Sequence, residues 1–215
     1  MSVATLILGQ SGTGKTASLR NLDPASTAMI KTVEKPLPFR SAGWKQFTTD
    51  NWANIIKTAR VAVDRGYSII VIDDFQYLMA NEFMRRSDEK GFEKFTEIAR
   101  HAWEIINALS SLPEYVRVYI LSHTQDDDYG RTKIKTIGKM LDEKITLEGL
   151  FTIVLRTQVS DGNYQLRTVN NGSDTVKAPM GLFESEAINN DLAAVDAGIV
   201  DYYGITLPKQ QEKTA

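Results

Sequence analysis

Residues 9–16 read Gly9-Gln10-Ser11-Gly12-Thr13-Gly14-Lys15-Thr16 and directly follow the apolar run Val3–Leu8. The spacing G-x-x-x-x-G-K-[ST] is that of a phosphate-binding loop, in which glycines let successive backbone N–H groups turn toward a triphosphate. A strand before the loop and a helix-compatible segment after it, residues 16–20, provide the context that this motif requires. The sequence therefore predicts a strand–loop–helix unit that binds a nucleoside triphosphate.

The polar residues of this loop have distinct expected roles. Lys15 reaches the β and γ phosphates, and the Thr16 hydroxyl binds Mg²⁺. A helix that begins near Lys15 presents the positive end of its dipole to the anion. The expected ATP-binding set is Gly9, Gln10, Ser11, Gly12, Thr13, Gly14, Lys15, Thr16 and Ala17.

The composition excludes several kinds of chemistry. The chain has 215 residues, is 42% hydrophobic and contains no cysteine, so it can bury a core without disulfides and offers no thiolate for catalysis or zinc. A formal net charge of −2 gives no global basic field, so a nucleic-acid contact requires a local patch or assembled subunits. No apolar stretch approaches a membrane span, and the first strand begins too early for a signal peptide. We expect one cytoplasmic domain over residues 1–204 and a flexible tail over 205–215.

Short β-rich apolar runs alternate with helical patterns along the chain. Strands are expected over residues 3–8, 26–33, 67–72 and 116–121, and helices over 51–64, 75–86, 92–112 and 185–197. Pro36 and Pro38 make residues 34–39 irregular, Gly66 ends the helix before it, and residues 122–138 form a polar loop. Two further strands, 151–159 and 164–169, flank a hairpin turn at residues 160–163. This pattern predicts an α/β P-loop fold, with a mostly parallel central sheet flanked by helices and a C-terminal β-hairpin.

A second motif is the apolar run of residues 69–72, which ends in the acidic pair Asp73-Asp74. An apolar strand that runs into a carboxylate looks like a Walker B element, and Asp73 is expected to order Mg²⁺ beside Thr16. For Asp74 two interpretations stay open. It is either a catalytic carboxylate or a cap for the helix that starts near Phe75.

Hydrolysis also needs a group that orients water against the γ phosphate. Glu34 is the first candidate, because it lies just past the second strand, at the edge of the sheet that also carries the phosphate-binding loop. Asp74 is the second candidate, and a solvated loop carboxylate is the alternative for Glu34. His123 follows the strand at 116–121, so it is either a polar sensor of the γ phosphate or a structural histidine.

Taken together, these motifs resemble a RecA-type P-loop ATPase. The resemblance narrows to small phage-encoded ATP-binding proteins of the AAA superfamily, including the single-domain RecA-like proteins of phage recombination modules. It spans roughly residues 3–183 and rests on residues 9–16, 35–39, 69–74, 122–123, 137–144 and 150–155.

The resemblance implies ATP binding and slow hydrolysis to ADP, assembly into homo-oligomeric rings or filaments, and binding or annealing of single-stranded DNA in recombination or replication. A phage single-strand-binding or replication protein is the implied partner, and the host cytoplasm the implied location. In such assemblies a basic residue of a neighbouring subunit completes the ATP site. Residues 176–179 resemble the segment that carries it, which makes Lys177 the first candidate, with Arg156 and Arg167 behind it. A solvated surface lysine remains the alternative.

One local basic cluster follows Gln125. It consists of Arg131, Lys133 and Lys135, with Lys139 nearby. The region resembles the mobile loops that face DNA in RecA-like folds, where lysines bind phosphates and an aromatic residue such as Tyr129 stacks on a base. The adjacent acidic residues 126–128 oppose this interpretation, and an ordinary solvated loop stays open.

Three functional hypotheses remain. The first is a DNA-stimulated ATPase, the second an ATP-dependent assembly switch with little turnover, and the third a small-molecule or nucleotide kinase. The chain lacks the Asn-Lys-x-Asp motif with which GTPases read their base. A kinase lid is typically rich in arginine, whereas the corresponding stretch has only Arg131. The kinase hypothesis stays open because residues 39–45 could form an acceptor pocket.

Overall fold

The computed structural model describes residues 1–138, 141 and 144–208. Most of the expected tail, residues 209–215, lies outside the described residues, as does Lys139 of the basic cluster. The division into one domain and a tail therefore stays a prediction.

The elements alternate between strands and helices over much of the chain. The strands are β1 (Val3–Leu8), β2 (Thr27–Lys31), β3 (Lys45–Thr48), β4 (Ile69–Asp73), β5 (Arg117–Ser122), β6 (Thr124–Asp126), β7 (Thr132–Ile134), β8 (Ile153–Ser160), β9 (Asn163–Arg167) and β10 (Ala187–Asn189). The helices are η1 (Thr16–Asn21), α1 (Trp52–Asp64), α2 (Gln76–Arg85), α3 (Glu93–Ser110), η3 (Leu147–Leu150) and α4 (Leu192–Tyr202), of which η1 and η3 are 3₁₀ helices.

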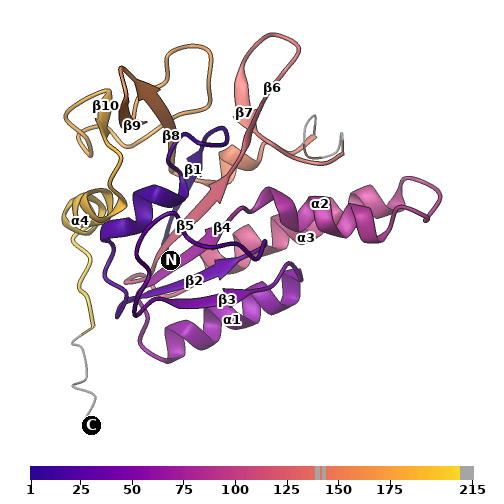
Figure 1. Cartoon of the computed structure of the whole chain (residues 1–215), viewed down its shortest axis with the longest axis horizontal. Coiled ribbons are helices and arrows are strands. Elements are labelled where there is room, and N and C mark those ends of the chain that lie inside the picture. The colour runs from indigo at the N-terminus through magenta and orange to yellow at the C-terminus, as the bar shows by residue number, and fades with distance from the viewer. Residues whose placement is uncertain (139–140, 142–143, 209–215) are drawn as a thin grey trace.

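The central sheet has eight strands in the order β10-β9-β8-β1-β5-β4-β2-β3 (Figure 1). The pairs from β8 through β1, β5, β4 and β2 to β3 are all parallel, whereas β8–β9 and β9–β10 are antiparallel. The predicted α/β fold, with a mostly parallel sheet and a C-terminal hairpin, is confirmed. Because β5 lies between β1 and β4, its carboxyl end stands between the glycine-rich loop and the acidic pair.

The sheet is covered on both faces. Alternate residues of β1 point to opposite sides: Leu6 and Leu8 join the core beneath α1 and α3, and Ile7 joins the core beneath η1 and α4. Figure 1 shows these helices on the two sides of the sheet. A strand that is buried on both faces needs apolar residues at every position, which explains why these strands appear as continuous apolar runs in the sequence.

Several local predictions are confirmed by backbone geometry. The hairpin between β8 and β9 turns at Asp161 and Gly162, whose φ angles of 51° and 77° are both positive, as in a two-residue type I′ turn. The helix expected over residues 51–64 is α1, which begins after Asn51, whose side chain accepts a hydrogen bond from the Asn54 N–H at 3.0 Å. Gly66, with φ 90°, follows the end of that helix.

Other predictions were wrong. The helix expected over residues 185–197 is instead strand β10 followed by α4, because β10 pairs with β9 and the Asp191 side chain caps the helix by accepting from Ala193 N–H. The polar loop of residues 122–138 contains the antiparallel β6–β7 ribbon. Strand β3 was missed, since its four residues are all exposed and show no apolar alternation.

A buried polar network attaches α4 to the sheet. Arg117 of β5 donates to both carboxylate oxygens of Asp196, from Nε and Nη2, at 2.9 Å each. The Tyr119 hydroxyl donates to the same carboxylate at 2.6 Å. Burial, followed by the Asp196 charge, raises the pKa of Tyr119 well above its ordinary value. The network fixes α4 on the face of the sheet that also carries η1.

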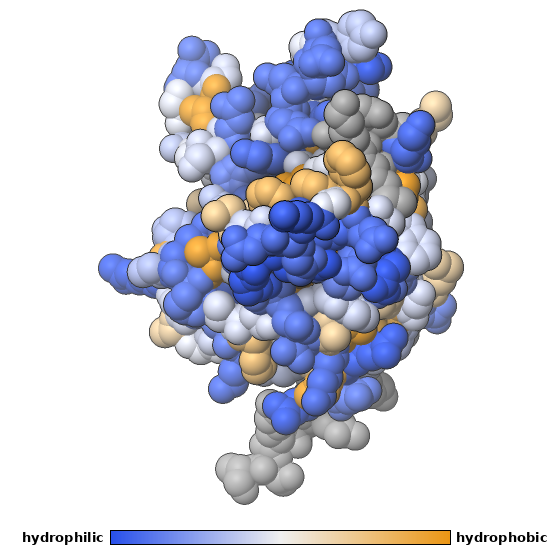
Figure 2. All heavy atoms as spheres, turned by 90° about the vertical axis from the view of Figure 1, so that its right-hand side faces the viewer, coloured by the Kyte–Doolittle hydropathy of each residue, from blue (hydrophilic) through white to orange (hydrophobic). Residues whose placement is uncertain are grey.

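The end of the molecule where α2 and α3 are joined is mostly hydrophilic. Figure 2 looks onto this end and shows hydrophobic residues in small groups. Among the large hydrophobic side chains, Met84 and Phe92 are strongly exposed there. Across the described helices, none combines the length and the apolar character that a membrane crossing requires.

Candidate nucleotide-binding site

The glycine-rich loop follows β1, and its glycines are needed for different reasons. Gly12 and Gly14 have φ angles of 78° and 96°, in the region that residues with a side chain disfavour. A Cβ on Gly12 would meet no atom within 4 Å, whereas a Cβ on Gly14 would lie 2.3 Å from Asn190 Nδ2. Gly9 has ordinary φ, but its Cβ would lie 1.9 Å from Thr157 Oγ1. The loop is therefore open at Gly12 and tightly packed at Gly9 and Gly14.

Residues from the distant C-terminal half support this loop. The hydroxyls of Thr13 and Thr157 are 2.6 Å apart, and Thr157 Oγ1 donates to the Leu8 carbonyl at 3.2 Å. The Asn190 side chain donates to the Gly14 carbonyl at 3.0 Å. Thr157 and Asn190 belong to no sequence motif, so only the folded structure identifies them as part of the site.

Lys15 is almost fully buried within the loop. Its ammonium donates to the carbonyls of Gly9 and Gln10 at 2.7 and 2.8 Å. Burial lowers the pKa of Lys15 to about 8, although the charges of Asp74 and Asp73 act in the opposite direction. At neutral pH the ammonium remains mostly protonated, and a phosphate beside it would stabilise the charged form.

The hydroxyl of Thr16 meets the acidic pair. Thr16 Oγ1 lies 3.1 Å from each carboxylate oxygen of Asp73. This contact joins the end of β4 to the loop that follows β1. Burial, and then the neighbouring Asp74 charge, raises the pKa of Asp73 to about 6. A hydroxyl and a carboxylate are oxygen ligands of the kind that Mg²⁺ binds while it keeps several waters or phosphate oxygens. The donor set therefore fits Mg²⁺ bound together with a nucleotide, and metal binding by Thr16 and Asp73 stays a prediction.

Asp74 adopts a left-handed backbone conformation, with φ 61°. The Thr32 hydroxyl donates to its carbonyl at 2.6 Å, and its carboxylate forms an ion pair with Lys35 and lies 3.7 Å from His123 Nε2. Burial alone raises the pKa of the Asp74 carboxyl, but His123 and Lys35 hold it below its ordinary value. The N-cap of α2 is Phe75, and the partners of the Asp74 carboxylate among the described residues are Lys35 and His123 rather than N–H groups of this helix, so the interpretation of Asp74 as a helix cap was wrong.

Glu34 makes its contacts with Lys31 and Thr48. Its carboxylate is mostly exposed, accepts from Lys31 Nζ at 3.0 Å, and also accepts from the Thr48 hydroxyl of β3. These two hydrogen bonds hold the pKa of Glu34 below its ordinary value. Among the described residues, its hydrogen-bonding partners are Lys31 and Thr48 rather than residues of the loop. A role for Glu34 in orienting water stays a prediction.

Lys35 is a charged residue beside Asp74 to which the motifs gave no role. Burial lowers its pKa, whereas the hydrogen bond and the charge of Asp74 raise it by more, so that the pKa of Lys35 lies above its ordinary value. Its charge also contributes to lowering the pKa of Lys15. The two ammonium groups therefore lie within electrostatic range of each other at the same end of the sheet.

The carboxyl end of β5 is held by a residue of α2. The buried Gln76 side chain accepts from the His123 N–H at 3.2 Å and from the Ser122 hydroxyl at 3.4 Å. The rings of His123 and Tyr77 meet edge to face, with centroids 6.2 Å apart. The structure thus places His123 beside Asp74, at the site, while its role as a sensor of the γ phosphate stays a prediction.

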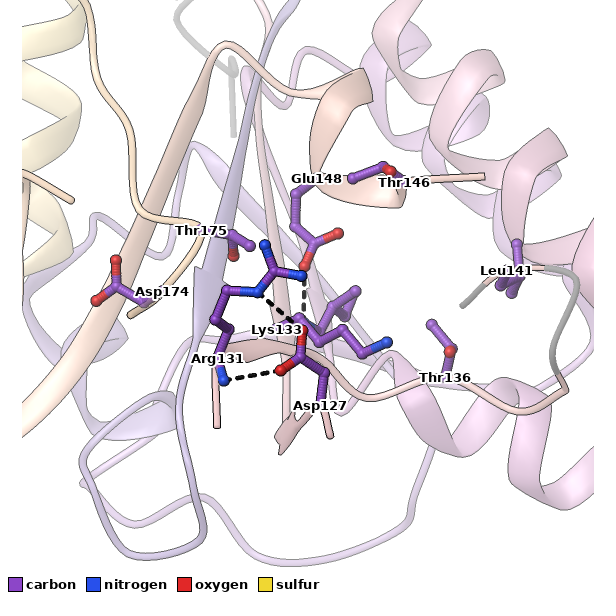
Figure 3. Close-up of a pocket in the computed structure, with 10 residues that line it drawn as sticks. Asp127, Arg131, Lys133, Thr136, Leu141, Thr146, Glu148, Asp174 and Thr175 are labelled. Carbon is purple, nitrogen blue, oxygen red and sulfur yellow. Dashed lines mark hydrogen bonds and ion pairs between the residues drawn. The ribbon is translucent and has the colours of Figure 1, made fainter. Parts of the chain in front are cut away.

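Of the expected DNA-binding cations, Lys133 lies in β7, Arg131 directly before it and Lys135 directly after it. Arg131 Nε donates to Asp127 Oδ2 at 3.0 Å, and Figure 3 shows Arg131 turned toward this carboxylate. Lys133 lines a cavity of about 260 Å³ beneath the ribbon, whereas Lys135 is exposed. Tyr129 is strongly exposed at the tip of the ribbon. Binding of DNA by Arg131, Lys133 and Lys135 stays a prediction.

The candidates for a residue that acts on a neighbouring subunit share one face of the sheet. Arg156 and Arg167 are directly opposite each other on β8 and β9, and Lys177 pairs with Val154 two residues earlier on β8. Residues that are opposite, or two apart on one strand, point to the same side. Val154 is in register with Leu6 of β1, two residues before the end of that strand at Leu8. Lys177 therefore lies further from the carboxyl edge of the sheet than the glycine-rich loop of its own chain.

A family model described as AAA domain matches residues 1–178 of the chain. The match includes the glycine-rich loop, the acidic pair, Lys35, His123 and Lys177, but not Asn190. No curated protein matches the chain.

Proposed function

Because the chain belongs to the AAA domain family, we propose that it binds ATP with Mg²⁺ and hydrolyses it to ADP and phosphate. The observation that carries this proposal is the contact of Thr16 with Asp73, beside the buried ammonium of Lys15. Lys15 and Thr16 follow β1, and Asp73 ends β4, which is not adjacent to β1 in the sheet, so the three groups meet where a phosphate chain and its metal ion are expected to bind.

The residues of the chain have separate roles in this proposal. The loop N–H groups and Lys15 hold the phosphates, while Thr16 and Asp73 hold the metal ion. Mg²⁺, when bound, neutralises charge that develops on the transferring phosphoryl group. Asp74 or Glu34 accepts a hydrogen bond from the attacking water and orients it, and His123 contacts the terminal phosphate.

The proposal extends to assembly and to DNA. The shared face of Arg156, Arg167 and Lys177 docks against a neighbouring subunit in a ring or filament, where one of these cations completes the second ATP site. The β6–β7 ribbon contacts single-stranded DNA through Lys133, Lys135 and the exposed ring of Tyr129. This assignment places the protein in phage DNA recombination or replication, through binding or annealing of single strands.

Steady-state ATP hydrolysis tests the function. Turnover is measured with and without single-stranded DNA over a range of protein concentrations, with light scattering on the same samples. We expect turnover per subunit to rise with protein concentration and with DNA, and Lys15→Ala to lose nucleotide binding or hydrolysis. Unchanged binding and hydrolysis in Lys15→Ala would refute the proposal. Turnover per subunit that depends on neither protein concentration nor DNA would instead favour a kinase, and nucleotide acceptors would then be screened.

An assembly switch with little turnover is the second candidate, and one observation favours it. Both carboxylates that are candidates for orienting water are already paired, Asp74 with Lys35 and Glu34 with Lys31 and Thr48. A carboxylate that is engaged in this way is a poor acceptor for a proton from water. If this candidate is correct, ATP promotes assembly and Glu34→Ala leaves that assembly unchanged.

A further inference from the structure

Lys35 brings a second ammonium to the phosphate end of the sheet. It pairs with Asp74, which directly follows the Asp73 that contacts Thr16. Its side chain is 42% exposed, whereas the Asp74 side chain is 4% exposed. One partner of the ion pair is therefore fixed in the protein, and the other reaches it from a more accessible position.

The backbone around Lys35 is anchored, which leaves its side chain as the part that can move. The buried ammonium of Lys31 donates to the Lys35 carbonyl at 3.1 Å and to Glu34 at 3.0 Å. Pro36 restricts the preceding residue to extended conformations. The Lys35 Cα thus has a defined position, while its flexible four-carbon side chain can exchange one anion for another.

A bound triphosphate would offer the Lys35 ammonium a second anion. The charges of Asp73 and Asp74 act on the ammonium groups of both Lys15 and Lys35, so two cations and two carboxylates already interact at this end of the sheet. A nucleoside triphosphate brings a terminal phosphate that a diphosphate lacks, and this phosphate offers oxygens that compete with Asp74 for the ammonium. Charge-assisted hydrogen bonds to phosphate are among the stronger polar contacts in proteins.

We propose that Lys35 is a second phosphate-binding lysine, whose ammonium leaves Asp74 and binds the terminal phosphate of a nucleoside triphosphate. The proposal rests on nucleotide binding at the glycine-rich loop. The exchange distinguishes triphosphate from diphosphate, and it frees the Asp74 carboxylate to accept a hydrogen bond when the triphosphate is bound. A lysine that only neutralises Asp74 would neither discriminate between the two nucleotides nor release the Asp74 carboxylate.

Calorimetric titration of five proteins with Mg²⁺ and either ADP or a non-hydrolysable ATP analogue tests this exchange. The first two are wild type and Asp74→Asn, and two more carry Lys35→Met or Lys35→Arg in the Asp74→Asn background. The fifth, Lys57→Met, is a control for an exposed lysine outside the site. The Asp74→Asn background matters, because Lys35→Met alone would leave an unpaired carboxylate that repels both nucleotides. Thermal unfolding of each variant verifies that it is folded.

We expect Asp74→Asn to bind the ATP analogue more tightly than wild type, since Lys35 is no longer held by a carboxylate. Adding Lys35→Met should then weaken analogue binding by about tenfold or more and change ADP binding by less than about threefold. Lys35→Arg in the same background should retain most of the preference for the triphosphate. Lys57→Met should match wild type with both nucleotides.

Two results would overturn the proposal while nucleotide binding itself stands. In one, Lys35→Met has no effect on analogue binding in the Asp74→Asn background, which would limit Lys35 to neutralising Asp74. In the other, ADP and the analogue lose affinity equally. If wild type binds neither nucleotide, the proposed function fails together with the role of Lys35.

Discussion

Replacement of Gly14 by alanine tests whether the C-terminal segment holds the phosphate-binding loop in place. The new Cβ would lie 2.3 Å from Asn190 Nδ2 and 2.9 Å from Tyr164 Cδ1, at a φ of 96°. Both distances are too short, so the Asn190 amide must move and lose its hydrogen bond to the Gly14 carbonyl. Gly66 provides a matched control, because it has a φ of 90° and a Cβ there would meet no atom within 4 Å.

The expected costs of the two substitutions differ in their origin. Backbone strain at positive φ costs about 1–2 kcal/mol, and reduced freedom of the unfolded chain offsets part of it, so Gly66→Ala should lose about 1 kcal/mol. Gly14→Ala has the same strain, and leaving the buried Asn190 amide without its partner adds about 1–3 kcal/mol. For a chain of this size, we expect the melting temperature to fall by about 3 °C in Gly66→Ala and by about 9 °C in Gly14→Ala.

Differential scanning calorimetry measures both temperatures, and titration with ADP follows the loop. Nucleotide affinity should fall in Gly14→Ala and stay at the wild-type value in Gly66→Ala. Asn190→Ala removes the side chain that a Cβ on Gly14 would contact most closely. The double variant with Gly14→Ala should therefore lose less stability than the sum of the losses in the two single variants. Equal melting temperatures for Gly14→Ala and Gly66→Ala, or strict additivity with Asn190→Ala, would refute the role of Asn190.

Three further predictions address the metal ion, the assembly and the core. Asp73→Asn should lower Mg²⁺-dependent ATP turnover by about a hundredfold or more, because it removes a carboxylate that holds the metal ion. Turnover is compared with wild type over a range of Mg²⁺ concentrations, and a near-wild-type rate would contradict this role. Lys177→Ala should keep nucleotide affinity yet lose ATP turnover. If Lys177 acts on the ATP site of a neighbouring subunit, mixing this variant with Lys15→Ala subunits should restore turnover. No recovery in the mixture would show that Lys177 lacks this role. Asp196→Ala should lower the free energy of unfolding, measured by chemical denaturation, by about 3–5 kcal/mol, because Arg117 is then buried without its carboxylate. Adding Arg117→Met should recover part of this loss. An unchanged unfolding midpoint in Asp196→Ala would show that the pair contributes no stability.

The parallel sheet and the two motifs could be predicted because their signals are local. Continuous apolar runs such as residues 69–72 predict strands that are buried on both faces, and the loop motif fixes its own turn through Gly12 and Gly14. The turn at Asp161 and Gly162 is local for the same reason, since both residues adopt the positive φ that the hairpin needs.

Elements whose conformation depends on distant pairing were harder to predict. Residues 187–189 have an apolar pattern that suits a helix, but hydrogen bonds from β9 make them a strand, and Asp191 delays the helix to Leu192. Strand β3 is exposed and has no apolar pattern of its own, so its pairing with β2 defines it. Local propensity is weak beside these tertiary interactions.

By itself, the sequence determined the phosphate-binding loop, the acidic end of β4 and the expectation that Thr16 and Asp73 share a metal ion. The tertiary structure decided the strand order that inserts β5 between them, and it decided which side chains meet there. Asn190 reaches Gly14 across 176 residues, and Lys35 rather than Glu34 contacts Asp74. Backbone motifs such as the loop and the hairpin turn depend on residues that are neighbours in the sequence. Contacts between charged side chains depend on where separate strands end in space, and only the folded sheet fixes those positions.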